Sequence, residues 1–186
     1  MLRNITFLAL LGAILLGSLS CGSEETIRVD LLPPGNARGS AAAGTYVWSE
    51  EITSTDCPAT VTVGTATIGL PRAEQEFTAC ADIVHDEGYY AVDMFVWDGP
   101  AGIDRPEYVA DGGLWQEGQF RIGGIFTFGT GVTARVLLDG QYLPPSGTEI
   151  VRSFEGNGLV QVFEPGTSGE DYLCEIRTTF NAHREP

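Results

Sequence analysis

The sequence predicts an all-β protein with a single antiparallel domain. Apolar and polar residues alternate with period two in repeated short runs from Gly44 onward, and no segment keeps an apolar stripe at helical spacing. Glycine is abundant, at 24 of 186 residues, and aromatic residues make up 10%, which suits strands and turns. We expect an up-and-down barrel because the strands follow one another through short connections; a two-sheet β-sandwich is the alternative.

The alternation places the strands in order. Tyr46, Trp48 and Ile52 share one face of the first strand, and a Gly123-Gly124 pair indicates a bulge or bend in a later one. Asn157-Gly158 lies between two apolar runs and predicts a hairpin turn. The remaining strands are expected at 60–63, 77–83, 90–97, 119–128, 132–138, 150–155, 159–164 and 172–180.

The first 20 residues have the pattern of a signal peptide. Arg3 supplies the positive charge, residues 5–16 form an uncharged apolar stretch too short to span a bilayer, and small residues precede Cys21. This ending resembles the lipobox of bacterial lipoproteins, although Ser18 stands where leucine is usual. The resemblance implies cleavage before Cys21 and attachment of diacylglycerol and an N-acyl chain to that cysteine.

A lipidated Cys21 implies a protein held in the cell envelope by its acyl chains. In this family an aspartate after the cysteine commonly retains the protein at the inner membrane, so the resemblance and Gly22 imply sorting to the outer membrane if the cell is Gram-negative. The alternative is an ordinary cut after Ser20, which leaves a secreted or periplasmic protein. Residues 21–43 are rich in Pro, Gly and Ala and indicate a flexible tether that lets a domain at 44–186 stand away from the bilayer; 26–32 is apolar enough to add an edge strand instead.

The charge balance limits the partners. The net charge is −15 and every cation is an arginine or histidine, since the chain has no lysine. Such an acidic domain repels nucleic acid and anionic headgroups, so neither is an expected partner. The absence of lysine also excludes Schiff-base chemistry on lysine.

Three cysteines remain once Cys21 carries lipid, so one disulfide at most can form within the chain. Cys80 alternates with polar residues, whereas Cys174 shares an expected core face with Tyr172, Ile176 and Phe180, which favours a Cys57–Cys80 pair and a buried Cys174. Cys57–Cys174 is the alternative if the first and last strands are neighbours.

Two groups of residues are candidates for binding. Asp98, Asp104, Glu107 and Asp111 fall in or near the longest loop and offer hard oxygen ligands for calcium, without the spacing of an EF-hand; a solvated acidic loop is the alternative. An outer aromatic face could bind sugars, apolar ligands or a protein, unless a neighbouring segment buries it. Its members are Tyr89, Phe95, Trp97, Tyr108 and Trp115.

The two histidines give no zinc pattern, and His85 precedes a turn where a surface position is expected. Gly44-Thr45-Tyr46 resembles the Gly-x-Trp start of lipocalin-like barrels, with tyrosine in place of tryptophan. We therefore expect a non-catalytic, lipid-anchored envelope protein with a binding or structural domain that faces the periplasm or the cell surface. A binding domain would take a partner protein, a glycan or a small apolar ligand. A hydrolase using carboxylates of the acidic loop on envelope or extracellular glycans is the alternative.

Overall fold

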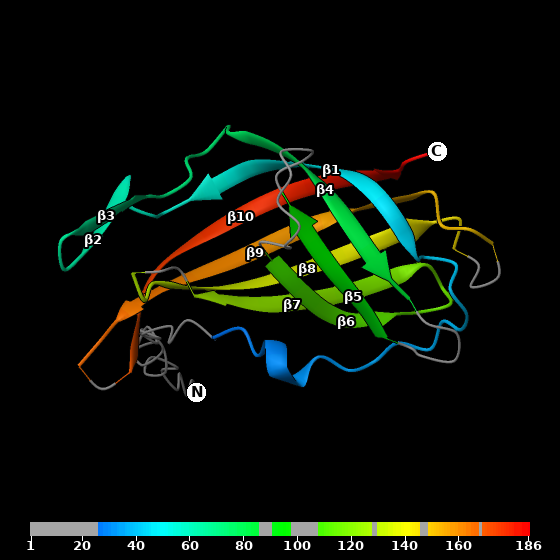
Figure 1. The fold of residues 1–186 in the computed structure, drawn as a ribbon, viewed down its shortest axis with the longest axis horizontal. Helices are drawn as coiled ribbons and strands as arrows, with labels where there is room; N and C mark the ends of the chain where they lie inside the picture. Colours follow the sequence, from blue (N-terminus) through cyan, green and yellow to red (C-terminus); the bar gives the residue numbers. More distant parts are fainter. Residues whose placement is uncertain (1–25, 86–90, 98–107, 128–129, 146–148, 168) are drawn as a thin grey trace, which may run out of the picture.

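The chain folds as an antiparallel β-barrel with a small hairpin at one end (Figure 1). The computed structural model describes residues 26–85, 91–97, 108–127, 130–145, 149–167 and 169–186. A 3-10 turn, η1 (Val29–Leu31), precedes ten strands: β1 (Gly44–Thr55), β2 (Thr60–Val63), β3 (Ala66–Gly69), β4 (Glu76–Val84), β5 (Ala91–Trp97), β6 (Tyr108–Leu114), β7 (Gln119–Thr127), β8 (Thr133–Leu143), β9 (Ser153–Pro165) and β10 (Glu170–Arg184).

Strand β1 closes the barrel by pairing antiparallel with both β10 and β4. The remaining neighbours follow the chain from β4 to β10, while β2 and β3 form a separate two-stranded sheet. The order confirms the predicted all-β, up-and-down barrel, because from β4 to β10 each strand pairs with the next strand in the sequence. Across the described part of the chain, no helix has the length and apolar character needed to cross a bilayer.

The inward face of the strands forms an apolar core. Phe154 lies edge-on to Tyr46 and to Phe120, with ring centroids 5.1 and 5.2 Å apart, and Trp48 stacks on Phe180 at 4.3 Å. These contacts follow from the alternation, since β1, β7, β9 and β10 each turn every second residue inward. Burial of such rings stabilises the barrel.

Arg184 closes one end of the barrel. Its guanidinium lies over the Tyr46 ring at 5.7 Å and donates to the carbonyl oxygens of Ala41, Ala43 and Val151. The Tyr46 hydroxyl in turn donates to Val151 O at 3.0 Å. Burial raises the pKa of Tyr46, and the Arg184 charge opposes that rise. We call this the closed end.

The opposite end carries the β2–β3 hairpin, and we call it the hairpin end. Val61 of β2 is 5% exposed and belongs to a second apolar cluster with Ile52, Val132, Val162, Cys174 and Ile176. Because β2 and β3 pair only with each other, this cluster and the disulfide attach the hairpin to the barrel.

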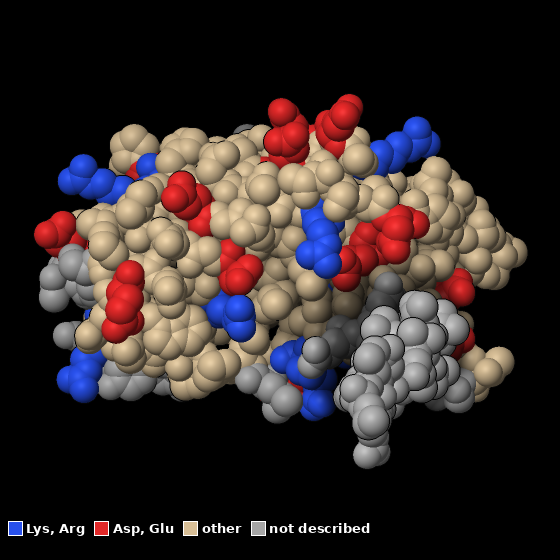
Figure 2. Space-filling model, turned by 180° about the vertical axis from the view of Figure 1, so that it is seen from behind, with Lys and Arg blue, Asp and Glu red and all other residues tan. Residues whose placement is uncertain are grey.

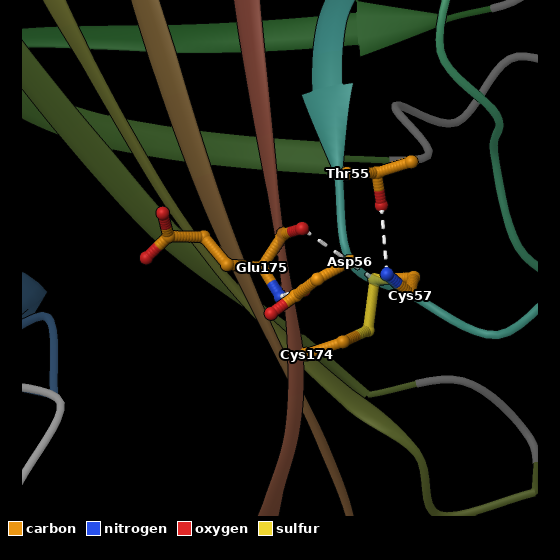
Figure 3. The surroundings of a disulfide bond; sticks show 5 residues. All are labelled: Thr55, Asp56, Cys57, Cys174 and Glu175. Atoms are coloured by element: carbon orange, nitrogen blue, oxygen red, sulfur yellow. Dashed lines mark hydrogen bonds between the residues drawn. A yellow bond between two sulfur atoms is a disulfide. The ribbon is translucent and has the colours of Figure 1, made fainter.

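The disulfide joins Cys57 to Cys174, so the favoured Cys57–Cys80 pairing is wrong and the alternative is correct (Figure 3). Closure of the barrel makes β1 and β10 neighbours, and Asp56 continues their pairing by donating its N–H to Glu175 O at 3.2 Å, while Asp56 Oδ1 accepts from Glu175 N at 2.6 Å. Cys174 is buried as predicted, and Cys80 is a half-buried free thiol.

Two turn predictions from glycine are wrong. β9 runs without a break through Asn157-Gly158, and β7 runs through Gly123-Gly124 with no shift in register. At Gly123 a Cβ would lie 2.8 Å from Val29 Cγ1, so glycine there allows η1 to pack on the sheet. The actual register shifts lie at Ile52/Ser54 and Tyr172/Cys174. The second leaves Tyr172 36% exposed instead of inside the core.

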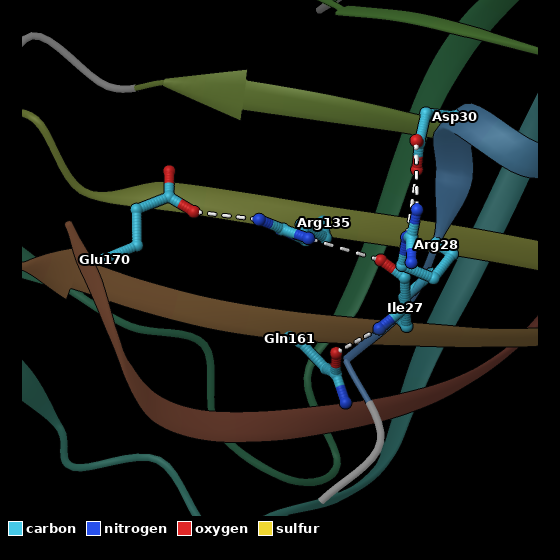
Figure 4. Close-up of polar contacts among 6 residues, drawn as sticks. All are labelled: Ile27, Arg28, Asp30, Arg135, Gln161 and Glu170. Carbon is cyan, nitrogen blue, oxygen red and sulfur yellow. Dashed lines mark hydrogen bonds and ion pairs between the residues drawn. The ribbon is translucent and has the colours of Figure 1, made fainter.

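Residues 26–43 pack along the outside of the barrel, where the sequence indicated a flexible tether; we call this segment the strap. It starts at the hairpin end, where Ile27 N donates to Gln161 Oε1 of β9 at 2.8 Å (Figure 4). Arg135 also binds the start of the strap, because it donates to Ile27 O. The same guanidinium forms an ion pair with Glu170 at 3.0 Å. The Arg135 guanidinium lowers the pKa of Glu170.

The strap then crosses to the closed end. Asn36 N and Ala37 N both donate to Leu114 O of β6, at 2.8 and 3.0 Å. A Cβ at Gly35 would lie 1.6 Å from that same oxygen, so only glycine fits this approach. Ala42 is fully buried beside the Tyr46 hydroxyl, whose oxygen lies 3.0 Å from Ala42 O as well. The strap therefore spans the barrel from the hairpin end to the closed end.

Candidate functional site

Glu50 is an acidic residue on the inward face of β1. It pairs in register with Phe180 of β10, two residues after Trp48 and two before Ile52. Both flanking inward residues are buried and apolar, whereas Glu50 itself is partly accessible. The barrel interior therefore presents a carboxylate between apolar residues of β1, with the buried Thr178 of β10 as a polar inward neighbour.

Gly158 makes room for this carboxylate on the facing strands. A Cβ at Gly158 would lie 2.2 Å from Thr178 Oγ1, 3.0 Å from Leu138 Cδ2 and 3.2 Å from Glu50 Oε1. Gly158 and Thr178 are register partners on β9 and β10, and Leu138 is the partner of Gly158 on β8. Glycine at this point thus serves packing around the acid, which explains why Asn157-Gly158 is not a turn.

Burial raises the pKa of Glu50 above its ordinary value, because a low-dielectric wall disfavours the charged form. The polar groups of Thr178 and Trp48, which stabilise the carboxylate, oppose this rise. No cation is among the groups that act on it. Glu50 is thus an acid without a counter-charge from the described part of the protein.

This pKa gives a pH dependence with a definite sign. A carboxyl group whose pKa is raised in the folded state binds more protons there than in the unfolded chain. Its contribution to the free energy of unfolding is therefore present below the ordinary pKa of 4.5 and is lost as the pH rises through the folded pKa. We expect Glu50→Gln to gain stability relative to the wild type as the pH rises above the ordinary pKa of 4.5. Urea unfolding at several pH values measures this, with the exposed Glu51→Gln as control. If the difference in stability between Glu50→Gln and the wild type stays constant with pH, the raised pKa of Glu50 is contradicted.

Solvent reaches the neighbourhood of Glu50 from the β4 side. Phe77 is its register partner on β4 and is 43% exposed, although it lies on the inward face. β4 pairs with β5 only from Cys80 onward, so among the described strands nothing covers the sheet beside Phe77. The carboxylate and an apolar ring therefore lie together at an accessible place in the wall.

The acidic candidates lie away from this position or outside the described residues. Asp111 is exposed and is the register partner of Asp93 in the β5–β6 pair, while Asp98, Asp104 and Glu107 fall outside the described ranges. Within the described ranges, the residues close enough to share a metal ion are Asp56, Cys57 and Cys174. Two of these form the disulfide, so this group does not offer thiolate ligands.

Of the five aromatic candidates, only Trp115 has a described side chain. It is half-buried in the turn after β6 and lines an open pocket of about 420 Å³ with Pro33, Phe120, Arg121 and Asp139. Tyr89 lies outside the described residues, as do the side chains of Phe95, Trp97 and Tyr108. The Arg121–Asp139 ion pair in this pocket is about half exposed on both sides, so it offers little binding energy.

His85 is 1% exposed, so the expected surface position is wrong. It follows directly after β4, whose inward residues Ala81 and Ile83 are also buried, and the same alternation carries His85 inward.

The surface charges are dispersed on the face seen in Figure 2. Acidic and arginine side chains are interspersed there, without a patch of one sign.

No protein-family model matches the chain, and the searches of curated proteins and of solved structures also find no match. The fold and the site define the protein as a closed antiparallel barrel with a carboxylate in its interior wall.

Proposed function

We propose that this chain is a non-catalytic envelope protein, anchored by lipid on Cys21, whose barrel binds a small and largely apolar ligand. Glu50 receives a hydrogen-bond donor or a cationic group of that ligand. The observation that carries the proposal is the inward Glu50, partly accessible and without a cation acting on it. An acid in an apolar wall lowers stability unless a partner compensates it, and a bound donor is such a partner.

The surroundings of Glu50 fit an amphipathic ligand. Trp48 and Phe180 form a stacked pair on the same wall. Phe77 of β4, the register partner of Glu50, adds an exposed ring. Binding sites for small molecules combine such apolar walls with a few oriented polar groups. The net charge of −15 also favours a cationic group over an anionic one.

A titration with N-phenyl-1-naphthylamine, a neutral apolar fluorophore with one N–H donor, tests the binding claim. We expect its emission to rise on binding, with quenching of tryptophan emission, and Glu50→Leu to weaken the affinity by roughly tenfold through loss of one hydrogen bond to a charged group. The exposed Glu51→Leu is the matched control. Saturable binding that Glu50→Leu leaves unchanged would show that Glu50 is not part of the site.

The anchor is tested separately. We expect Cys21→Ser to move the protein from the detergent phase to the aqueous phase on detergent partition, because several acyl chains bind a bilayer firmly and a bare chain does not. A variant that stays in the detergent phase contradicts lipidation at Cys21.

A further inference from the structure

We propose that the hairpin end of the barrel faces the lipid bilayer and that the β2–β3 hairpin contacts its surface. This inference rests on the proposed lipidation of Cys21. Two independent features support it, namely where the strap begins on the barrel and the lack of charge on the hairpin.

The start of the strap limits the distance between the anchor and the barrel. Ile27 is held to Gln161 of β9 and to Arg135 of β8 at the hairpin end. Five peptide links separate Cys21 from Thr26, which is at most about 18 Å of extended chain. Because residues 26–43 pack on the barrel, they do not lengthen this connection. The lipid anchor therefore holds the hairpin end close to the membrane, with the closed end pointing away.

The same end carries the least charged surface element. Residues 57–71 contain no charged side chain, in a protein of net charge −15. Thr60, Thr62, Thr65 and Thr67 are exposed on this hairpin. The hairpin projects at the upper left of Figure 1, and in the reverse view of Figure 2 the upper corner of the corresponding end is tan, with acidic side chains below it. An uncharged, threonine-rich hairpin approaches anionic headgroups without the repulsion that an acidic face meets.

The hairpin is held rigidly enough to keep this orientation. Val61 packs into the apolar cluster of the hairpin end, and the Cys57–Cys174 disulfide joins the chain before β2 to β10. Its position relative to the strap is therefore set by the barrel and not by a flexible connection.

The test uses the full-length lipidated protein in vesicles of phosphatidylethanolamine and phosphatidylglycerol that contain brominated phosphatidylcholine. A fluorophore is placed at Thr65→Cys on the hairpin or at Ile150→Cys near the closed end, both in a Cys80→Ser background that removes the free thiol. Ile150 is the matched control because it is 62% exposed. Thr67→Cys repeats the hairpin position if Thr65→Cys folds poorly.

We expect bromolipid to quench the hairpin label at least severalfold more than the Ile150 label. Equal quenching at both positions, or stronger quenching at Ile150, overturns the orientation. Flotation of the same samples separates the two proposals. Protein that floats but shows no preference contradicts the orientation alone, whereas protein that does not float contradicts the lipid anchor, and the orientation falls with it.

Discussion

Removal of the Cys57–Cys174 disulfide is expected to cost about 4–5 kcal/mol of unfolding free energy. The bond joins residues 117 positions apart, so its loss frees a long loop in the unfolded chain. It also releases the segment that leads into β2, which is otherwise attached through Val61 and its apolar neighbours. We therefore expect the hairpin end to lose order first.

Urea unfolding of the Cys57→Ala/Cys174→Ala double variant measures this loss. Cys80→Ser is the control, since that thiol is free and half-buried, and it should change the stability by about 0.5 kcal/mol or less. A loss below about 1 kcal/mol in the double variant contradicts the chain-entropy argument. Hydrogen exchange then locates the effect, which should be largest in β2, β3 and the adjoining part of β10.

Substitution of Arg184 by methionine is expected to cost about 3 kcal/mol, because charge-assisted hydrogen bonds at a part-buried site are lost together. The guanidinium donates to main-chain oxygens of the strap and of Val151 and lies over the Tyr46 ring. Without it, these oxygens lose a partner and the strap loses its attachment at the closed end. Methionine keeps the apolar stem and so separates charge from packing.

Arg177→Met is the matched control for this change. Arg177 also lies on β10 but pairs with Glu175 on the surface with 61% of its side chain exposed, so its loss should cost under about 1 kcal/mol. Equal effects of the two substitutions would show that Arg184 does not hold the closed end. Limited proteolysis after Arg38 adds a direct measure of strap release.

The sequence was sufficient for the fold class because period-two alternation directly reports which residues face inward. Tyr46 and Trp48 on β1, like Ile176 and Phe180 on β10, lie inside the barrel as their spacing predicts. Where alternation is interrupted, the prediction fails. Tyr172 leaves the core because the register shifts before Cys174.

Glycine and cysteine depend on long-range contacts that no local pattern contains. Asn157-Gly158 has the composition of a turn, but Gly158 is needed because Thr178 and Glu50 occupy the space of its side chain. The disulfide partner of Cys57 depends on β1 lying beside β10, which is known only once the barrel closes.

Glu50 was missed although the signal was present. It stands in phase with Tyr46, Trp48 and Ile52, so alternation alone places it on the inward face. The face was assigned from its apolar members Tyr46, Trp48 and Ile52, which passes over the acidic residue between them. An acidic residue in phase with an apolar face is therefore a feature that sequence reading can use to find interior sites.

Native mass spectrometry of the protein isolated from its own envelope tests the binding claim most directly. The wild type is predicted to carry a non-covalent small-molecule adduct that Gly158→Ala loses, since the added methyl group would collide with Thr178 and crowd Glu50. Gly69→Ala, on the hairpin with open space around it, is predicted to keep the adduct. A wild-type protein without an adduct, or an adduct retained by Gly158→Ala, would contradict a ligand site at Glu50.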